Sequence, residues 1–167
     1  MVNSARPLER RDLPELAQLC REHAEFEKAA WNDFDRTEKL DALFLDSADA
    51  RCWVVDGEGE LAGFASVTLE RSTWDADRFL HLDCIFLRPG YRGRALGQVL
   101  MTRVARAAVE FGAVNLQWQT PAWNADAIRF YRRLGASAAE KLRFTMTPDQ
   151  CAQWLDRPAS GAQENSP

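Results

Sequence analysis

The sequence predicts an α/β fold in which helices cover a mixed β-sheet, with the element order βααβββαβαβα. Three observations lead to this prediction. Apolar residues repeat at helical spacing in the first part of the chain, the period changes to two near residue 51, and strands alternate with single helices after residue 79. With 167 residues, of which 46% are hydrophobic, the chain suits one compact domain, which we place at residues 1–157.

The first part of the chain predicts a short strand followed by two helices. We expect the strand near residues 5–8 and the second helix near residues 37–45. Between them, Asp12 and Glu15 have the spacing of a capping box, which predicts that the first helix begins after Asp12.

Alternation of apolar and polar residues then predicts three strands. Residues 51–56 and 61–70 flank a glycine-containing turn, so they form a hairpin, and residues 79–87 form the third strand. The most regular helix of the chain follows and ends at Gly112. Its apolar stripe consists of Leu96, Val99, Leu100, Val104, Ala107, Ala108 and Phe111.

The rest of the chain predicts two strands, near residues 114–118 and 141–145. Asn124 caps a short helix between them, which ends at Gly135. Thr147 then opens a last helix, because Pro and Gln stand at the first and third positions after it.

Residues 158–167 are rich in Pro, Ser, Ala, Gly and Gln. Such a composition buries too little apolar surface to order a chain, so we expect a disordered tail.

Charge and composition exclude several classes of partner. The formal net charge of −4 disfavours nucleic acid and anionic membranes as partners. We expect no metal and two structural histidines, since His23 and His81 are too few for a zinc site and the cysteines form no CxxC pair. The chain shows neither a signal peptide nor an apolar run of about 20 residues. These features predict a cytoplasmic protein with free thiols at Cys20, Cys52, Cys84 and Cys151.

The connection between the third strand and the long helix predicts a phosphate site. Backbone N–H groups at the start of a helix are unpaired and carry partial positive charge. Gly93, Ala95 and Gly97 are small enough to let an anion approach them, and Arg92 and Arg94 add positive charge. The alternative is a glycine-containing connection without a ligand, because the stretch matches neither a P-loop nor GxGxxG followed by an acid.

A second candidate is Tyr131, seven residues after Asn124 and so about two helical turns along. A phenol with a reference pKa of about 10 stays protonated at neutral pH and can donate a proton to a departing thiolate. The alternative is a tyrosine that packs on an amphipathic helix.

Taken together, the two stretches resemble the GNAT superfamily of N-acetyltransferases. Arg92-x-x-Ala95-x-Gly97 is similar to its acetyl-CoA loop, Arg/Gln-x-x-Gly-x-Gly/Ala. Asn124-x-x-Ala127-Ile128-x-Phe130-Tyr131-x-x-x-Gly135 is similar to its second cofactor motif. The resemblance covers residues from about 5 to 147, and it implies a mostly antiparallel sheet. The chain departs from the pattern at Ala95, where the superfamily usually has glycine.

Within the superfamily, the chain looks most like the diamine and polyamine acetyltransferase branch. Trp123-Asn124, the stretch from Phe130 to Ala136, and Leu82-Asp83 carry this narrower resemblance. Phe26-Glu27 also resembles a Tyr-Glu pair that the branch uses near its amine site.

The resemblance implies a set of residues that bind acetyl-CoA. Residues 85–87 would pair with the pantetheine arm through their backbone, and residues 93–98 would cradle the pyrophosphate. Asn124, Ala127 and Tyr131 belong to the second motif. The set consists of Ile85, Phe86, Leu87, Arg92, Gly93, Arg94, Ala95, Leu96, Gly97, Gln98, Asn124, Ala127 and Tyr131.

The resemblance also implies the residues that act on the amine. Tyr131 would be the general acid that faces the sulfur. Asp83 stands where the branch usually has a glutamate that receives the amine proton through water, and alternation places it on the strand face opposite Leu82 and Cys84. The alternative is that Asp83 only pairs with an arginine or binds the charge of the substrate.

Acids and aromatic residues also gather near the N-terminus, in a pattern that suits a cationic amine. Glu27 is the first candidate, and Phe26, Glu27 and Asp83 form the predicted substrate site. The wider set comprises Glu22, Glu25, Asp33 and Asp35 around Trp31 and Phe34, although such charges are commonly a solvated face.

The resemblance therefore implies an enzyme that transfers acetyl from acetyl-CoA to a primary amine of a small diamine, polyamine or lysine-like molecule. Attack would be direct, without a covalent enzyme intermediate, and the enzyme would be a homodimer. Two alternatives stay open: acetylation of protein lysines or N-termini, and a module that binds acetyl-CoA without turnover.

Overall fold

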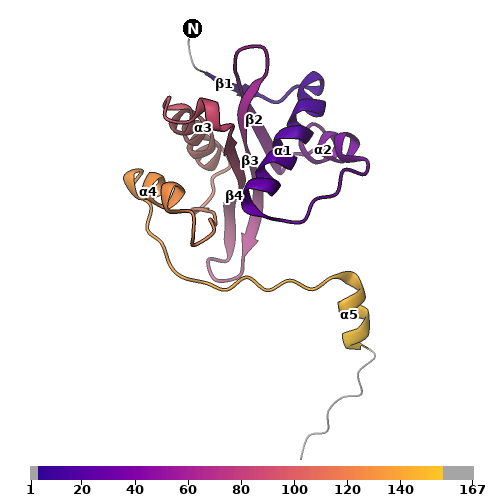
Figure 1. Cartoon of the computed structure of the whole chain (residues 1–167). Helices are drawn as coiled ribbons and strands as arrows, with labels where there is room; N and C mark the ends of the chain where they lie inside the picture. The colour runs from indigo at the N-terminus through magenta and orange to yellow at the C-terminus, as the bar shows by residue number, and fades with distance from the viewer. Residues whose placement is uncertain (1–3, 156–167) are drawn as a thin grey trace, which may run out of the picture. The chain divides into compact units, whose positions relative to one another are not determined.

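The structure, a computed structural model, describes residues 4–155 of the chain. The chain divides into two compact units, residues 1–125 and residues 126–167. The first contains the whole sheet and three helices (Figure 1). The expected tail at residues 158–167 lies outside the described residues, and a single domain over residues 1–157 stays a prediction.

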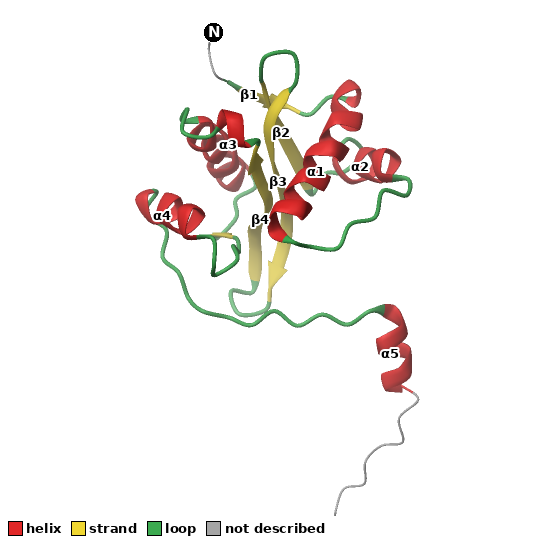
Figure 2. Ribbon diagram, in the orientation of Figure 1, coloured by secondary structure: helices red, strands yellow, loops and turns green. Residues whose placement is uncertain are grey.

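The sheet of the first unit is mixed and mostly antiparallel, which confirms the predicted fold class (Figure 2). Its strands lie in sequence order, the first four antiparallel and the fifth parallel to the fourth. They are β1 (Ala5–Pro7), β2 (Ala50–Asp56), β3 (Leu61–Ser72), β4 (Asp77–Leu87) and β5 (Leu116–Gln117).

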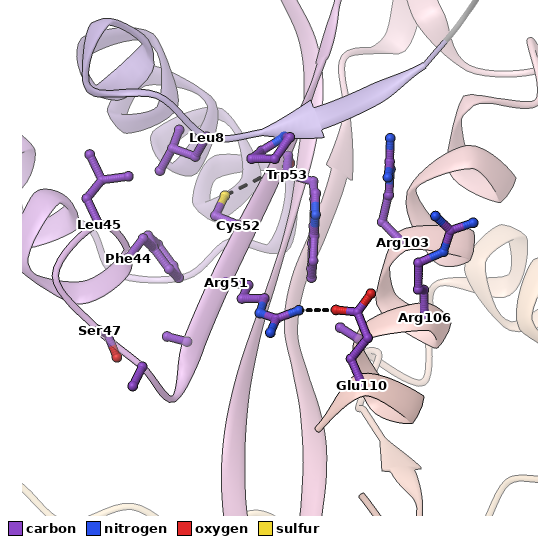
Figure 3. A pocket seen from close by; sticks show the side chains of 14 residues that line it. Leu8, Phe44, Leu45, Ser47, Arg51, Cys52, Trp53, Arg103, Arg106 and Glu110 are labelled. Atoms are coloured by element: carbon purple, nitrogen blue, oxygen red, sulfur yellow. Dashed lines mark hydrogen bonds and ion pairs between the residues drawn. The ribbon is translucent and has the colours of Figure 1, made fainter. Parts of the chain in front are cut away.

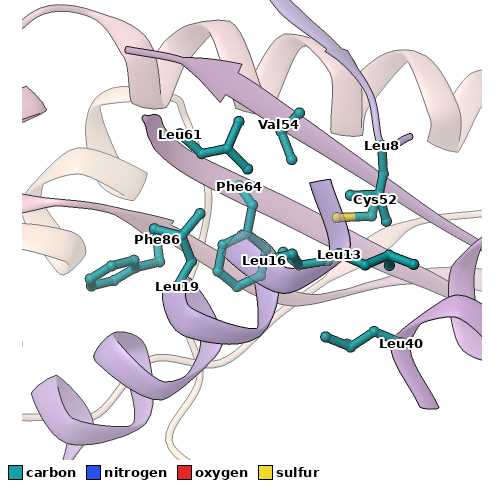
Figure 4. Packing of buried hydrophobic residues seen from close by; sticks show 10 residues of the cluster. All are labelled: Leu8, Leu13, Leu16, Leu19, Leu40, Cys52, Val54, Leu61, Phe64 and Phe86. Atoms are coloured by element: carbon teal, nitrogen blue, oxygen red, sulfur yellow. The ribbon is translucent and has the colours of Figure 1, made fainter. Parts of the chain in front are cut away.

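Helices cover both faces of this sheet. Helices α1 (Leu13–Glu27) and α2 (Arg36–Phe44) lie on one face, and α3 (Leu96–Glu110) lies on the other. The α1 face is a continuous apolar cluster from both helices and strands β2 to β4 (Figure 4). Its buried members include Leu16, Leu19, Leu40, Val54, Phe64 and Phe86. The predicted stripe of α3 is buried at Leu96, Leu100, Val104 and Ala107, together with Met101.

The start of α1 differs from the prediction. A short 3-10 helix, η1 (Arg10–Asp12), leads into α1, and no side-chain hydrogen bond from Asp12 caps the helix. The Asp12 carboxylate instead accepts hydrogen bonds from Arg6 Nη1, at 2.7 Å, and from the Glu9 N–H, at 2.9 Å. The capping box of Asp12 and Glu15 is therefore wrong, because a guanidinium is the stronger partner for a nearly buried carboxylate.

The second unit contains helix α5 (Pro148–Leu155) and all but the first residue of α4 (Ala125–Arg133). The capping box that opens α5 is confirmed: the Thr147 N–H donates to Gln150 Oε1 at 2.8 Å, and the Gln150 N–H donates to Thr147 Oγ1 at 3.2 Å. The strand predicted at residues 141–145 is wrong, since the described part of this unit has no strand with which it could pair.

A buried arginine ties α1 to the hairpin and to the end of β4. Arg88, only 8% exposed, donates from Nε and Nη2 to both carboxylate oxygens of Glu22, each at 2.9 Å. Its Nη1 also donates to Glu15, Glu60 and the Leu61 carbonyl, at 3.0, 2.6 and 2.9 Å. The hydrogen bonds from Arg88 lower the pKa of Glu22 below its ordinary 4.5.

We predict that Arg88→Met lowers the free energy of unfolding by about 2 kcal/mol, because it leaves carboxylates unpaired that are only partly solvated. Urea denaturation at pH 7 measures this effect. The pKa of Glu22 is lower in the folded than in the unfolded protein. The ion pair with Arg88 therefore stabilises the fold fully above pH 4.5, and this stabilisation is lost as the pH falls through the folded pKa of Glu22. The difference between variant and wild type should therefore shrink as the pH falls, and a constant difference would contradict the ion-pair explanation.

Candidate functional site

The predicted phosphate loop is fixed at several points. It begins with a 3-10 helix, η2 (Pro89–Tyr91), directly after Arg88. The Tyr91 hydroxyl accepts a hydrogen bond from the Glu58 N–H at 3.1 Å, and its ring lies so close to Gly57 that an added Cβ there would lie 2.6 Å from it. Arg92 Nε donates to the Leu87 carbonyl at 3.0 Å. The loop is thus anchored to the hairpin and to β4.

The first turn of α3 presents an uncapped helix start. No side-chain hydrogen bond caps the helix and no acid stands in its first turn, although the Ala95 carbonyl accepts from the Gln98 and Val99 N–H groups. Gly93 and Ala95 both have positive φ, of 75° and 61°. Such a turn directs backbone N–H groups outward and suits an anion.

The sheet opens next to this loop. β4 and β5 pair only at Leu80 with Leu116 and at His81 with Gln117. Beyond these pairs, the edge of β4 that includes residues 85–87 faces no further strand in the part of the chain that the structure describes. Backbone pairing of residues 85–87 with a pantetheine arm stays a prediction.

A β-bulge places Asp83. Ser66 pairs with Cys84, but Val67 pairs with Leu82, so Asp83 is an extra residue between the two pairs. Because paired residues share a face and neighbours alternate, Leu82 and Cys84 point to opposite faces of the sheet. The prediction that they share a face is therefore wrong, since the bulge interrupts the alternation. Asp83 is exposed, and its carboxylate lies 3.6 Å from the Cys84 thiol on the α1 side.

Acidic and aromatic side chains meet where α1 passes the end of β4. Phe26 lies 6.4 Å from Phe86 and 5.6 Å from Trp123 between ring centroids. The Arg92 guanidinium covers the rings of Phe26 and Phe86, at 4.7 and 5.7 Å. We name this group the acidic-aromatic cluster. Its members are His23, Phe26, Glu27, Phe86, Arg92 and Trp123, together with Asp83, whose charge acts on His23.

His23 belongs to this cluster, although the sequence analysis assigned it a structural role. Its ring stacks on Phe86 with centroids 5.1 Å apart and meets the edge of Phe64 at 6.3 Å. Its Nε2 lies 3.3 Å from Glu27 Oε1. Burial lowers the pKa of His23, while Glu27 and Asp83 oppose this effect. The four-residue spacing of His23 and Glu27 on a helix was the signal that could have found this pair.

Glu22, Trp31 and Phe34 of the wider N-terminal set already have partners. Glu22 pairs with Arg88. The ring of Trp31 is covered by the Arg36 guanidinium at 4.1 Å, and the ring of Phe34 by the Lys39 ammonium at 5.1 Å. Among the N-terminal acids singled out from the sequence, Glu27 is thus the one that lies in the acidic-aromatic cluster.

The second predicted motif begins at the junction of the two units. Asn124 immediately precedes α4, and its N–H donates to the Pro121 carbonyl at 2.9 Å. Ala127 and Tyr131 follow on α4, where the ring of Tyr131 lies 5.4 Å from that of Phe130. Because these two residues belong to the second unit, their approach to the phosphate loop stays a prediction.

A pocket of about 540 Å³ lies elsewhere in the first unit (Figure 3). It is lined by residues of β1 and β2, the loop before β2, and the middle of α3, including Arg51, Arg103 and Arg106. Arg51 pairs with Glu110 across it. None of its lining residues belongs to the phosphate loop or to the acidic-aromatic cluster.

Residues 4–155 contain neither a cluster of metal-ligating side chains nor a membrane-spanning helix. No group of three or more His, Cys, Asp or Glu side chains in this range could hold a metal ion. Nor does any helix within it have the length and apolar character needed to cross a membrane.

The comparisons with known proteins agree on one family. A model described as "Acetyltransferase (GNAT) family" matches residues 15–136. The chain is 29% identical to an L-ornithine N5-acetyltransferase of Arabidopsis thaliana over 126 residues, which cover 74% of this chain and 55% of that one. The chain thus spans about half the length of that relative. It is also 32% identical to a thialysine N-epsilon-acetyltransferase of Caenorhabditis elegans over 117 residues, 70% of this chain and 72% of the relative.

Solved structures show the same fold. One is an aminoglycoside acetyltransferase from an uncultured soil metagenomic sample, with a TM-score of 0.72 and 19% identity. The match covers 86% of this chain and 95% of that structure.

We predict that Ala95→Gly raises the free energy of unfolding by up to about 1 kcal/mol, because alanine is strained at a φ of 61° whereas glycine is not. Thermal or urea denaturation tests it. Ala48→Gly, in a loop and without a positive φ, is the matched control and should gain nothing. Equal or lower stability of Ala95→Gly would show that the loop carries no such strain.

Proposed function

Because the chain belongs to the acetyltransferase (GNAT) family, we propose that it transfers the acetyl group of acetyl-CoA to a primary amine. We further propose that the amine belongs to a small diamine, a polyamine or a lysine-like molecule. The names of two relatives, which act on ornithine and thialysine, support this substrate class.

The observation that carries the substrate proposal is the acidic-aromatic cluster. Glu27 and Asp83 supply two carboxylates, and Trp123 supplies an exposed aromatic ring, whereas Arg92 already covers the rings of Phe26 and Phe86. Carboxylates attract an alkylammonium group, and aromatic faces bind it through cation–π contacts. The cluster shares Arg92 with the phosphate loop, so an amine bound there lies near the start of α3.

The loop fits the phosphates of acetyl-CoA. The uncapped start of α3 offers backbone N–H groups, Gly93 and Gly97 carry no side chains, and space around Gly93 is open. Ala95 keeps the left-handed conformation that glycine would adopt at this position, so its methyl group does not prevent the turn from forming. We propose that residues 92–98 hold the pyrophosphate and that residues 85–87, Asn124, Ala127 and Tyr131 complete the cofactor site.

Acetyl-CoA supplies an activated thioester, so the protein has only to orient the amine and manage protons. In the proposed reaction the amine attacks the thioester directly, and Tyr131 protonates the departing sulfur. Asp83 and Glu27 hold the ammonium form of the substrate. An aspartate in solvent is a weak base, so we assign Asp83 to binding the substrate.

Two alternatives from other classes of function remain testable. An enzyme that acetylates protein lysines or N-termini would turn over peptides faster than free diamines. A module that binds acetyl-CoA without turnover would release no thiol with either. For the assembly and location of the protein we propose a homodimer, from the family resemblance, and the cytoplasm, which agrees with four free cysteines.

We predict that diamines or lysine analogues drive coenzyme A release from acetyl-CoA, and that Tyr131→Phe lowers kcat by about 100-fold, because the sulfur loses its proton donor. A thiol assay across a panel of amines and lysine peptides measures both effects. Phe130→Leu, at the neighbouring position of α4, is the control that changes packing and keeps the phenol. Acetyl-CoA binding without release on any acceptor would exclude the proposed function.

We also predict that Glu27→Gln raises the KM for a diamine about tenfold or more, because it removes a charge-assisted contact to the ammonium. Glu25→Gln, which removes the same charge from an exposed position of α1, should leave KM within about twofold. If both variants changed KM equally, the effect would come from net charge and not from the cluster.

A further inference from the structure

His23 is the least exposed titratable side chain of the acidic-aromatic cluster. Its side chain is 15% exposed, so part of the ring stays accessible to solvent. Phe86 stacks on one face of the ring and Phe64 contacts it edge-on, so the ring is held in one orientation. Glu27, the proposed substrate carboxylate, lies 3.3 Å from its Nε2.

We propose that His23 is the general base of the amine site, and accepts a proton directly from the substrate ammonium held by Glu27 and Asp83. This proposal rests on the proposed function, because it assigns a role within the same reaction. It also resolves a difficulty of the site: the substrate must lose a proton before it attacks, and neither carboxylate is well suited to remove it.

The proton balance is complete without a further reactant. Because Nε2 faces the Glu27 carboxylate, it carries the proton of the neutral ring, and the ammonium R–NH₃⁺ gives one proton to Nδ1 of His23. The freed nitrogen lone pair of the amine forms a bond to the thioester carbonyl carbon. The C–S bond then breaks, and the sulfur leaves with the bonding pair. Of the three ammonium protons, one is on His23, one stays on the amide nitrogen, and one replaces the proton that Tyr131 gives to the sulfur of coenzyme A. His23 returns its proton to solvent before the next turnover.

The surroundings keep His23 neutral in the resting protein. Burial is the largest cause of its lowered pKa. The charged groups that act on it are Glu27 on α1 and Asp83 on β4, which favour protonation, and Arg92 in the loop after β4, which opposes it. A neutral imidazole at pH 7 can accept a proton, and the two carboxylates stabilise the imidazolium that forms.

The first test is the pH dependence of wild type, His23→Gln and His81→Gln, with the best amine of the panel. In the wild type, kcat/KM should rise with pH along a limb whose pKa lies below the ordinary 6.5 of histidine. His23→Gln should lose about 100-fold in kcat at pH 7 and lose this limb, with the KM for acetyl-CoA unchanged. His81→Gln, which alters the only other histidine, should behave as wild type.

Two further measurements separate a base from a packing residue. Activity of His23→Gly should be partly restored by added imidazole, which cannot repair a fold. Histidine NMR of the wild type bound to coenzyme A should show a lower pKa of His23 when a diamine is added, because the bound ammonium repels the imidazolium.

The outcomes are distinguishable. If the amine turns over but His23→Gln keeps its kcat within threefold and keeps the limb, His23 is not the base. Loss of kcat without imidazole rescue, together with an unchanged His23 titration when the diamine is added, would equally overturn the proposal. If no acceptor is turned over by the wild type, the proposed function fails first and this inference fails with it.

Discussion

The candidate site depends on the hydrogen bonds of Arg88. This residue is the last before the phosphate loop, and its guanidinium binds Glu15 and Glu22 on α1 and Glu60 and the Leu61 carbonyl at the start of β3. Because two of these partners are seven residues apart on one helix, the contact fixes both the position of α1 along β4 and its rotation. His23, Phe26 and Glu27 follow directly on that helix, so the same contact sets where the cluster forms.

The bulge at Asp83 adds a second constraint. In an uninterrupted strand, a residue between Leu82 and Cys84 would point away from both. Here the extra residue shifts the alternation of the strand, so that Leu82 points to the α3 face while Cys84 and Phe86 point to the α1 face. The carboxylate of Asp83 consequently reaches the side where Phe86, His23 and Glu27 lie. The bulge thus places a carboxylate at the polar site while β4 stays paired with β3 on both sides of Asp83.

Much of this arrangement follows from sequence, and the exceptions have physical causes. Periodicity predicted the helices and four of the five strands closely, because burial enforces the period of each element. It could not predict the bulge, since register depends on the neighbouring strand. The strand predicted at residues 141–145 does not form for the same reason: a strand also needs a neighbouring strand to accept and donate its backbone hydrogen bonds, which alternation alone cannot show. Asp12 does not cap α1, because its carboxylate binds the Arg6 guanidinium and the Glu9 N–H instead.

The formal charges of the cluster also favour proton transfer to His23. Glu27 and Asp83 contribute two negative charges, Arg92 one positive charge, and a neutral His23 none, so the site carries a net charge of −1 before the substrate enters. One ammonium group brings it to zero. Transfer of a proton to His23 moves the positive charge from the amine to the imidazole and leaves the total unchanged. The partly buried ring therefore gains its proton without a change in the net charge of the partly desolvated site, so the free-energy cost of the proton transfer stays small.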